Sequence, residues 1–255
     1  MRNTLVLSFM ALMFMPTQAQ LVAEPKAHPS PAEYVSAVEI HPILHSAMAL
    51  EWNGHTVLVD PHGGSERYAR FPSLELVLIT DIHGDHLDTA TLRGIDLAKA
   101  RIVAPQAVMD LLPADLKTLC TALANGARTA QLEIGIEAIP MYNMPDPKDA
   151  RHPKGRGNGY VLTFGTERFY ISGDTEDIPE MRALTGIDVA FVCMNLPYTM
   201  TVHQAASGVL AFRPKVVYPY HYRGKDGLSD VALFKRLVNE GDPAIGIRLV
   251  DWYAP

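Results

Sequence analysis

The stretch LVLITDIHGDHLD, residues 76–88, runs from an apolar segment into a group of side chains that can bind a metal ion. The apolar part has the length of a strand, and the residues that follow read as a helix with Asp88 as its N-cap. This order places the group at the carboxyl end of a strand, where α/β folds build their sites. The group consists of Asp81, His83, Asp85 and His86. Taken alone, it fits a metal site and a polar loop equally well.

The first twenty residues, MRNTLVLSFMALMFMPTQAQ, combine one Arg, an apolar run over residues 5–15 and a small-residue box at 17–19. This pattern predicts a secretory signal peptide over residues 1–19 and one mature domain over residues 20–255. An uncleaved anchor is the alternative, although the run is too short to cross a bilayer. We therefore expect an exported protein, periplasmic or secreted, without a membrane span after signal removal.

The composition narrows the range of partners. Of the 255 residues, 48% are apolar and 20% charged, which is enough for a full core. The formal charge is -6, and it becomes -7 (21 minus 28) when Arg2 leaves with the signal peptide, so nucleic-acid binding is not expected. Cys120, in an expected helix, and Cys193, in an expected buried strand, are interpreted as buried thiols, with a disulfide as the alternative.

Hydrophobic patterning predicts strands in both halves of the chain. Residues 45–52 and 55–61 read as a hairpin joined by Asn53-Gly54, the pair that a type I′ turn prefers. Residues 107–126 read as a broken helix, and residues 244–253 as a final strand. The last third alternates helices with strands. The whole pattern suggests two mixed sheets packed together with helices outside.

Three further segments carry ligand-type residues near expected strand ends: Asp174, His221, and His152 in a long irregular loop. TDIHGDH resembles the HxHxDH signature of the metallo-β-lactamase superfamily. YISGDTEDIPEM and YPYHY resemble the later metal-ligand segments of that superfamily. The loop with its following strand, MYNMPDPKDARHPKGRGNGYVLTFG, and MNLPYTMTVHQAA are similar to the branch that includes L-ascorbate-6-phosphate lactonase-like proteins. The resemblance covers about residues 36–225.

The resemblance implies an α/β (α+β) fold, the four-layer αβ/βα metallo-β-lactamase sandwich, with two divalent metal ions between its sheets. It implies a first metal held by Asp81, His83 and His152, and a second held by Asp85, His86 and His221. Asp174 matches the carboxylate that bridges both metals. Asp85 and Asp174 are the expected catalytic residues, with Asp85 orienting the nucleophile. Asp60 matches a position that supports the metal loop through hydrogen bonds.

Asp81 departs from the pattern, because it stands where the signature has its first His. Two divalent ions bring +4 and three carboxylates bring -3, which leaves +1, whereas a His at this position would leave +2. The additional negative charge is expected to make a bound water less acidic. Zinc is the first expectation, with manganese or iron as alternatives that oxygen ligands favour. The alternative is that Asp81 only hydrogen-bonds a ligand.

The predicted activity is hydrolysis, in which a metal-activated hydroxide attacks a lactone, ester or phosphoester of a small polar substrate. His45, Asn143, Asn195, Tyr198 and Tyr222 are candidates for substrate contact, as is Tyr142, while Lys154 and Arg156 could meet an anionic group. Other readings are a β-lactam hydrolase, a di-iron oxidoreductase of the same scaffold, or a metal-binding protein without turnover. The sequence predicts no oligomeric state.

Overall fold

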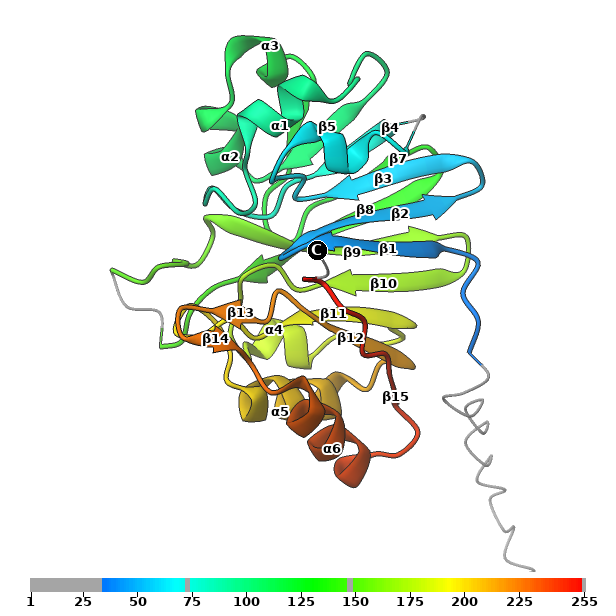
Figure 1. The fold of residues 1–255 in the computed structure, drawn as a ribbon, viewed down its shortest axis with the longest axis vertical. Coiled ribbons are helices and arrows are strands. Elements are labelled where there is room, and N and C mark those ends of the chain that lie inside the picture. Colours follow the sequence, from blue (N-terminus) through cyan, green and yellow to red (C-terminus); the bar gives the residue numbers. More distant parts are fainter. Residues whose placement is uncertain (1–33, 72–73, 146–148, 254–255) are drawn as a thin grey trace, which may run out of the picture.

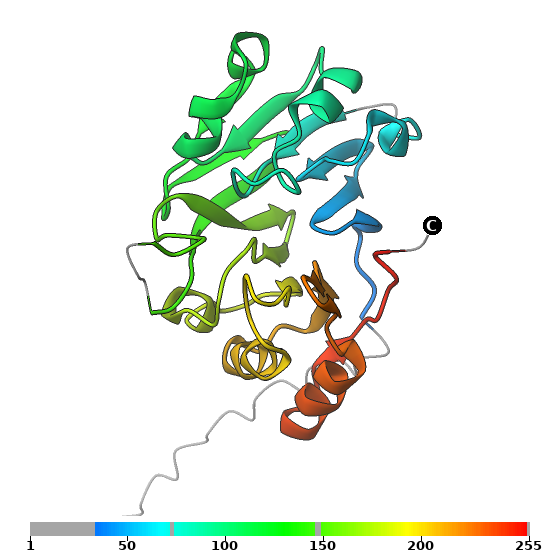
Figure 2. The ribbon, with the colours of Figure 1, turned by 60° about the vertical axis from the view of Figure 1, so that its left-hand side comes forward.

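Two β-sheets face one another in the computed structural model, which describes residues 34–71, 74–145 and 149–253. The predicted signal peptide lies outside the described residues. Helices cover the outer side of each sheet, so that the layers run helix, sheet, sheet, helix (Figures 1 and 2). This is the predicted four-layer arrangement. Among the described residues, none of the helices has the length and hydropathy needed to span a bilayer.

The first sheet has six strands in chain order, β1 to β6. They are β1 (Glu39–Leu44), β2 (Ala47–Trp52), β3 (His55–Val59), β4 (Leu74–Leu78), β5 (Arg101–Ala104) and β6 (Cys120–Ala122). The elements outside it are η1 (Ser65–Tyr68), α1 (Thr89–Gly94), α2 (Gln106–Leu111) and α3 (Ala114–Lys117). Strands β3 to β6 run parallel, so their carboxyl ends meet at one edge.

The second sheet has seven strands in the order β15-β12-β11-β10-β9-β8-β7. They are β7 (Arg128–Gln131), β8 (Ile134–Met141), β9 (Gly157–Phe164), β10 (Glu167–Ile171), β11 (Val189–Cys193), β12 (Val216–Tyr220) and β15 (Gly246–Ile247). Its helices are α4 (Pro179–Arg182), α5 (Val202–Phe212) and α6 (Val231–Gly241), and β13 (Arg223–Gly224) pairs with β14 (Gly227–Leu228). Strands β10, β11 and β12 are parallel.

Alternate residues of β4 enter two different cores. Leu76 and Leu78 face the second sheet, whereas Val77 faces the helices of the first. All three side chains are fully buried. A strand buried on both faces is a continuous apolar run, and this explains the apolar sequence before Asp81.

Several local predictions are confirmed. Asn53 and Gly54 both have positive φ and join β2 to β3. Asp88 accepts hydrogen bonds from the backbone N–H groups of Ala90 and Thr91 and caps α1. Cys120 and Cys193 are free and buried.

Other predictions of secondary structure were wrong. Residues 120–122, expected in a helix, form β6, which pairs with β5. The expected strand over residues 244–253 is a strand only at Gly246–Ile247. Strand β1 was not predicted, because its residues are only partly buried and Pro42 interrupts the alternation.

Candidate metal centre

The predicted ligands gather where parallel strands of both sheets end. Asp81 follows β4 of the first sheet, and Asp174 and His221 follow β10 and β12 of the second. Backbone hydrogen bonds join the sheets here, from Asn158 N to Thr80 O (2.9 Å) and from His221 N to His45 O (3.2 Å). The site therefore belongs to neither sheet alone.

Two groups of potential ligand atoms form, with the atoms of each group all within 4.8 Å of one another. One group consists of Asp81, His83 and His152, and the other of Asp85, His86 and His221. This is the division that the sequence predicted. Their roles as ligands stay a prediction.

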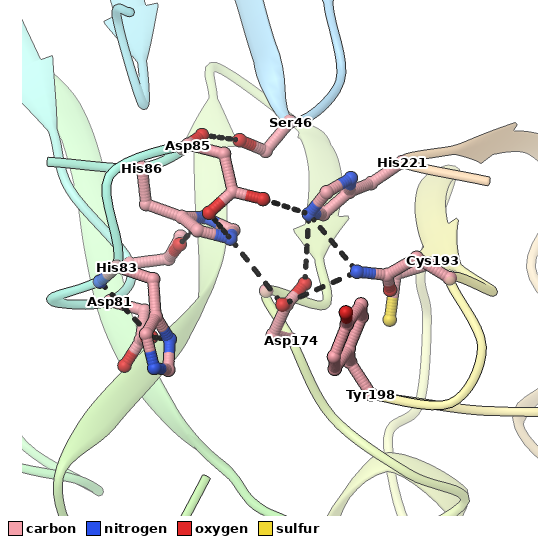
Figure 3. Close-up of polar contacts among 12 residues, drawn as sticks. Ser46, Asp81, His83, Asp85, His86, Asp174, Cys193, Tyr198 and His221 are labelled. Carbon is pink, nitrogen blue, oxygen red and sulfur yellow. Dashed lines mark hydrogen bonds and ion pairs between the residues drawn. The ribbon is translucent and has the colours of Figure 1, made fainter. Parts of the chain in front are cut away.

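Asp174 lies between the two groups (Figure 3). Its Oδ2 is 3.4 Å from His86 Nε2 and 3.3 Å from His152 Nε2, and its Oδ1 is 3.3 Å from His221 Nε2. One carboxylate thus contacts histidines of both groups. This is the position that a bridging ligand needs.

Several buried polar atoms of the site lack a hydrogen-bond partner among the described residues, and their types are those that bind a metal ion. His86 Nε2, His152 Nε2 and Asp174 Oδ1 are buried and have no hydrogen-bond partner among the described residues. An unpaired buried polar atom costs about 1–3 kcal/mol. Imidazole nitrogens and carboxylate oxygens are ordinary ligands of zinc, manganese and iron, so the set suits such an ion.

The charged residues of the site shift one another's pKa values. Burial raises the pKa of the Asp81 carboxyl, but its hydrogen bond with His83 and the nearby histidines outweigh burial and lower the pKa to about 2. Burial likewise raises the pKa of Asp174, and the charges of His221 and His86 hold it well below its usual range. Burial lowers the pKa of His86, but Asp174 and Asp60 raise it well above its ordinary value.

Asp60 holds His86 in position, as predicted for a supporting residue. Its Oδ2 accepts from Thr80 Oγ1 (2.6 Å) and lies 2.8 Å from His86 Nδ1, and its Oδ1 accepts from Thr80 N (2.7 Å). With Nδ1 bound in this way, the other ring nitrogen, Nε2, points into the site. The sequence analysis had not identified Thr80.

Asn143, a candidate for substrate contact, hydrogen-bonds the loop of His152. Its Oδ1 accepts from His152 N (2.8 Å), its backbone N donates to His152 O (2.9 Å), and its Nδ2 donates to Tyr198 O (2.8 Å). These contacts occupy the carboxamide. The residue therefore acts on the site through His152.

Asn195 points its amide into the site. Its Nδ2 is 3.2 Å from His221 Nε2 and 3.5 Å from Asp174 Oδ2, while Thr199 Oγ1 donates to its Oδ1 (2.6 Å). Thr199 thus fixes which end of the amide faces the metal ligands. Tyr198, which is half-buried, lies on the Asp174 side of the site (Figure 3).

His45 and Tyr222 have different surroundings. The His45 ring packs edge-on against His221, with ring centroids 5.5 Å apart, so it forms a wall of the second group. Burial and the nearby His221 and His62 lower its pKa to about 4, which leaves it neutral at pH 7. Tyr222 is buried, and its hydroxyl donates to Val250 O (3.3 Å), so it holds the C-terminal segment rather than a substrate.

The cations expected to meet an anionic substrate are paired with carboxylates. Lys154 Nζ is 2.7 Å from Glu180 Oε1, and Tyr142 donates to Glu180 Oε2 (2.9 Å). Arg156 Nη2 is 3.2 Å from Asp81 Oδ1. Each cation is therefore paired with a carboxylate. Tyr142 shares the Glu180 carboxylate with Lys154.

Three residues of the site have left-handed backbones although none is Gly: His45 (φ 51°), Asp60 (φ 45°) and His221 (φ 44°). Such conformations are strained for residues with a Cβ and concentrate at functional sites. At the ends of β3 and β12 they turn the chain sharply, which places Asp60 and His221 beside the metal loop.

Comparison with known proteins gives the family. The model of the beta-lactamase superfamily domain matches residues 55–222. A UPF0173 metal-dependent hydrolase of Pyrococcus horikoshii is 30% identical over 214 residues, covering 80% of this chain and 93% of that protein.

Two solved structures of hydrolases have a similar fold. A candidate metal-dependent hydrolase from Parabacteroides distasonis is 39% identical, with a TM-score of 0.73 over 83% of this chain and 92% of that one. A metallo hydrolase from Ignicoccus hospitalis is 25% identical, with a TM-score of 0.69 over 84% and 95%. The chain therefore belongs to the metallo-β-lactamase superfamily, among its metal-dependent hydrolases.

Proposed function

We propose that this protein is an exported two-metal hydrolase that opens a lactone or cleaves an ester of a small polar molecule. The observation that carries the proposal is the position of Asp174, within 3.4 Å of histidine nitrogens from both ligand groups. A single metal would use only one group and would leave the other buried histidines unpaired. The signal-like N-terminal sequence supports export.

When bound, a metal pair polarises the scissile bond and supplies hydroxide at neutral pH. The residues of this chain orient the attacking group and the substrate. The Asp85 side chain is 42% exposed, whereas that of Asp174 is 5% exposed, so Asp85 marks the open side of the site. It accepts a proton or hydrogen bond from the attacking group and orients it toward the substrate.

Asn195 is the donor best placed for the oxyanion. Its Nδ2 lies 3.2 Å from His221 Nε2. With His221 holding a metal, this amide would be available to donate to an oxygen of the substrate. A fixed donor that meets negative charge as it develops lowers the barrier.

The pairing of Lys154 with Glu180 and of Arg156 with Asp81 favours an uncharged carbonyl centre. A phosphoester would bring charge that these cations do not meet. We therefore place lactones and carboxylic esters before phosphoesters and β-lactams. Zinc is the expected metal because four of the seven proposed ligands are histidines, with manganese and iron as alternatives.

The test is elemental analysis of the purified mature protein, followed by assays of lactone, ester, phosphodiester and β-lactam substrates with zinc, manganese or iron restored. We expect two metals per chain and turnover of a lactone or ester. His86→Ala and Asp174→Ala should abolish turnover, while circular dichroism shows the fold retained. One metal or none, without turnover after reconstitution, would rule out the proposal. Wild-type turnover in both variants would show that the site is misassigned.

A further inference from the structure

Asp81 and Arg156 form an ion pair at the edge of the first ligand group. Arg156 Nη2 donates to both oxygens of Asp81, at 3.2 Å to Oδ1 and 3.4 Å to Oδ2. The Asp81 side chain is fully buried, and that of Arg156 is 21% exposed. The same carboxylate contacts His83, and its Oδ2 is 3.9 Å from His152 Nε2. Asp81 Oδ2 therefore lies near both the Arg156 cation and two histidines of the ligand group.

The fold builds this pair from backbone contacts between the sheets. Asn158 N donates to Thr80 O (2.9 Å), which places the residues before β9 beside the end of β4. A Cβ on Gly157 would lie 3.0 Å from Thr80 O and 2.3 Å from the flexible end of the Met141 side chain, so this close approach favours glycine. The sequence RGN at residues 156–158 thus supplies the cation, the close approach and the inter-sheet hydrogen bond.

The pair changes the charge of the site. Two divalent ions (+4) with Asp81, Asp85 and Asp174 (-3) leave +1, and Arg156 restores +2. A histidine in place of Asp81, without the arginine, also gives +2. This contact offsets the additional negative charge that Asp81 would otherwise bring to the centre.

We propose that Arg156 is the residue that neutralises Asp81 and so allows an aspartate to replace histidine in the first ligand group. It binds both carboxylate oxygens, and Oδ2 is also directed toward His83 and His152. Asp81 and Arg156 together are the equivalent of one neutral ligand. This inference rests on the proposed function, because it needs a metal in the first group.

The direction in which metal affinity changes when Arg156 is removed distinguishes it from an ordinary supporting residue. A carboxylate that holds a ligating histidine strengthens metal binding, so its loss weakens the affinity. A cation that holds a ligating carboxylate competes with the metal for the same oxygens. Removal of Arg156 should therefore tighten metal binding, and it should destabilise the metal-free protein because Asp81 is left buried and unpaired.

The experiment is a double-mutant cycle on the full mature chain, with zinc affinity measured by chelator competition and metal-free stability by thermal unfolding. Arg156→Met should tighten the first site about tenfold or more and lower the metal-free Tm. Asp81→His should weaken it by a similar factor, because Arg156 then faces the metal without its carboxylate. The double variant should return to within about threefold of wild type. Lys154→Met, which removes a cation of the same loop, is the matched control and should leave the affinity unchanged.

Arg156→Lys keeps the charge and should stay close to wild type, whereas Arg156→Gln removes it and serves if the Met variant does not fold. An unchanged affinity with a raised KM in Arg156→Met would overturn the inference in favour of a substrate contact. A weakened affinity would overturn it in favour of orientation alone. Fewer than two metals in the wild-type protein would instead refute the proposed function, so the two failures can be told apart.

Discussion

The neighbouring Thr199 sets the orientation of the Asn195 side-chain amide. An amide has a donor end and an acceptor end, and the Thr199 hydroxyl takes the acceptor end at 2.6 Å. The Thr199 Oγ1 atom itself accepts from Asn195 N at 2.9 Å. The donor end is left facing Asp174 and His221. The amide of Asn143, in contrast, bonds the backbone of His152 and of Tyr198.

Asn195→Ala should therefore lower kcat by about 10²–10³ while leaving the metal content unchanged, because it removes a donor to the oxyanion. Asn143→Ala is the contrasting variant. It should loosen His152 and reduce occupancy of the first site. The measurements are steady-state kinetics and elemental analysis of both variants. Equal metal loss in the two proteins would mean that Asn195 only supports the ligands.

At the level of single residues, the sequence predicted which candidate ligands lie together. Asp81, His83, Asp85 and His86 lie in one loop, so their proximity needs no long-range contact. The partners of these residues were harder to predict. Arg156 was interpreted as a substrate contact, because its pairing with Asp81 depends on how two sheets meet. Nothing in a local pattern indicates that contact.

Strand β9 illustrates how a secondary-structure element positions a residue of the site. Gly159 faces the segment that leads from β10 to Asp174, and a Cβ there would lie 2.8 Å from Ser172 O and 2.9 Å from Ile171 O. Both are backbone atoms that cannot move aside as a flexible side chain can. The strand therefore needs a residue without a side chain to let the carboxylate approach the histidines.

Gly159→Ala should lower the free energy of unfolding by about 1–3 kcal/mol, because the backbone at Ser172 must shift. The shift should also displace Asp174 and weaken metal binding. Denaturant unfolding and chelator competition measure the two effects. Gly84→Ala is the control, since a Cβ there meets nothing within 4 Å, and it should change stability by no more than about 0.5 kcal/mol. Equal stability of the two variants would contradict the argument.

Elements were predicted where local chemistry defines them. The Asp88 cap, for example, forms as predicted. Strand β6 was missed because its three residues, Cys120–Ala122, gain strand geometry only by pairing with β5.

At the scale of the whole molecule, the ligand groups join the two sheets. The first sheet supplies the loop after β4, and the second supplies His152, Asp174 and His221. A bound metal therefore stabilises the packing of one half against the other. Ligand that reaches a thousand times its dissociation constant stabilises a native state by about 4 kcal/mol.

Removal of metal by a chelator should thus lower the Tm by about 8–16 °C, since about 1 kcal/mol corresponds to 2–4 °C for a domain of this size. Differential scanning calorimetry with and without chelator measures the shift. His86→Ala should show a much smaller shift on chelation, because its second site is already impaired. An identical Tm with and without metal in the wild-type protein would contradict a site that bridges the sheets.

The distance along the chain between the proposed ligands has a kinetic consequence. They extend from Asp81 to His221, so no ligand group is complete until both sheets have formed and docked. A metal cannot assist the earlier steps of folding, because the unfolded chain offers no assembled site. Its stabilisation must appear in the rate of unfolding, with refolding left almost unchanged. In this protein the metal would bind only after the two sheets have docked. It would then slow unfolding and lengthen the lifetime of the native state.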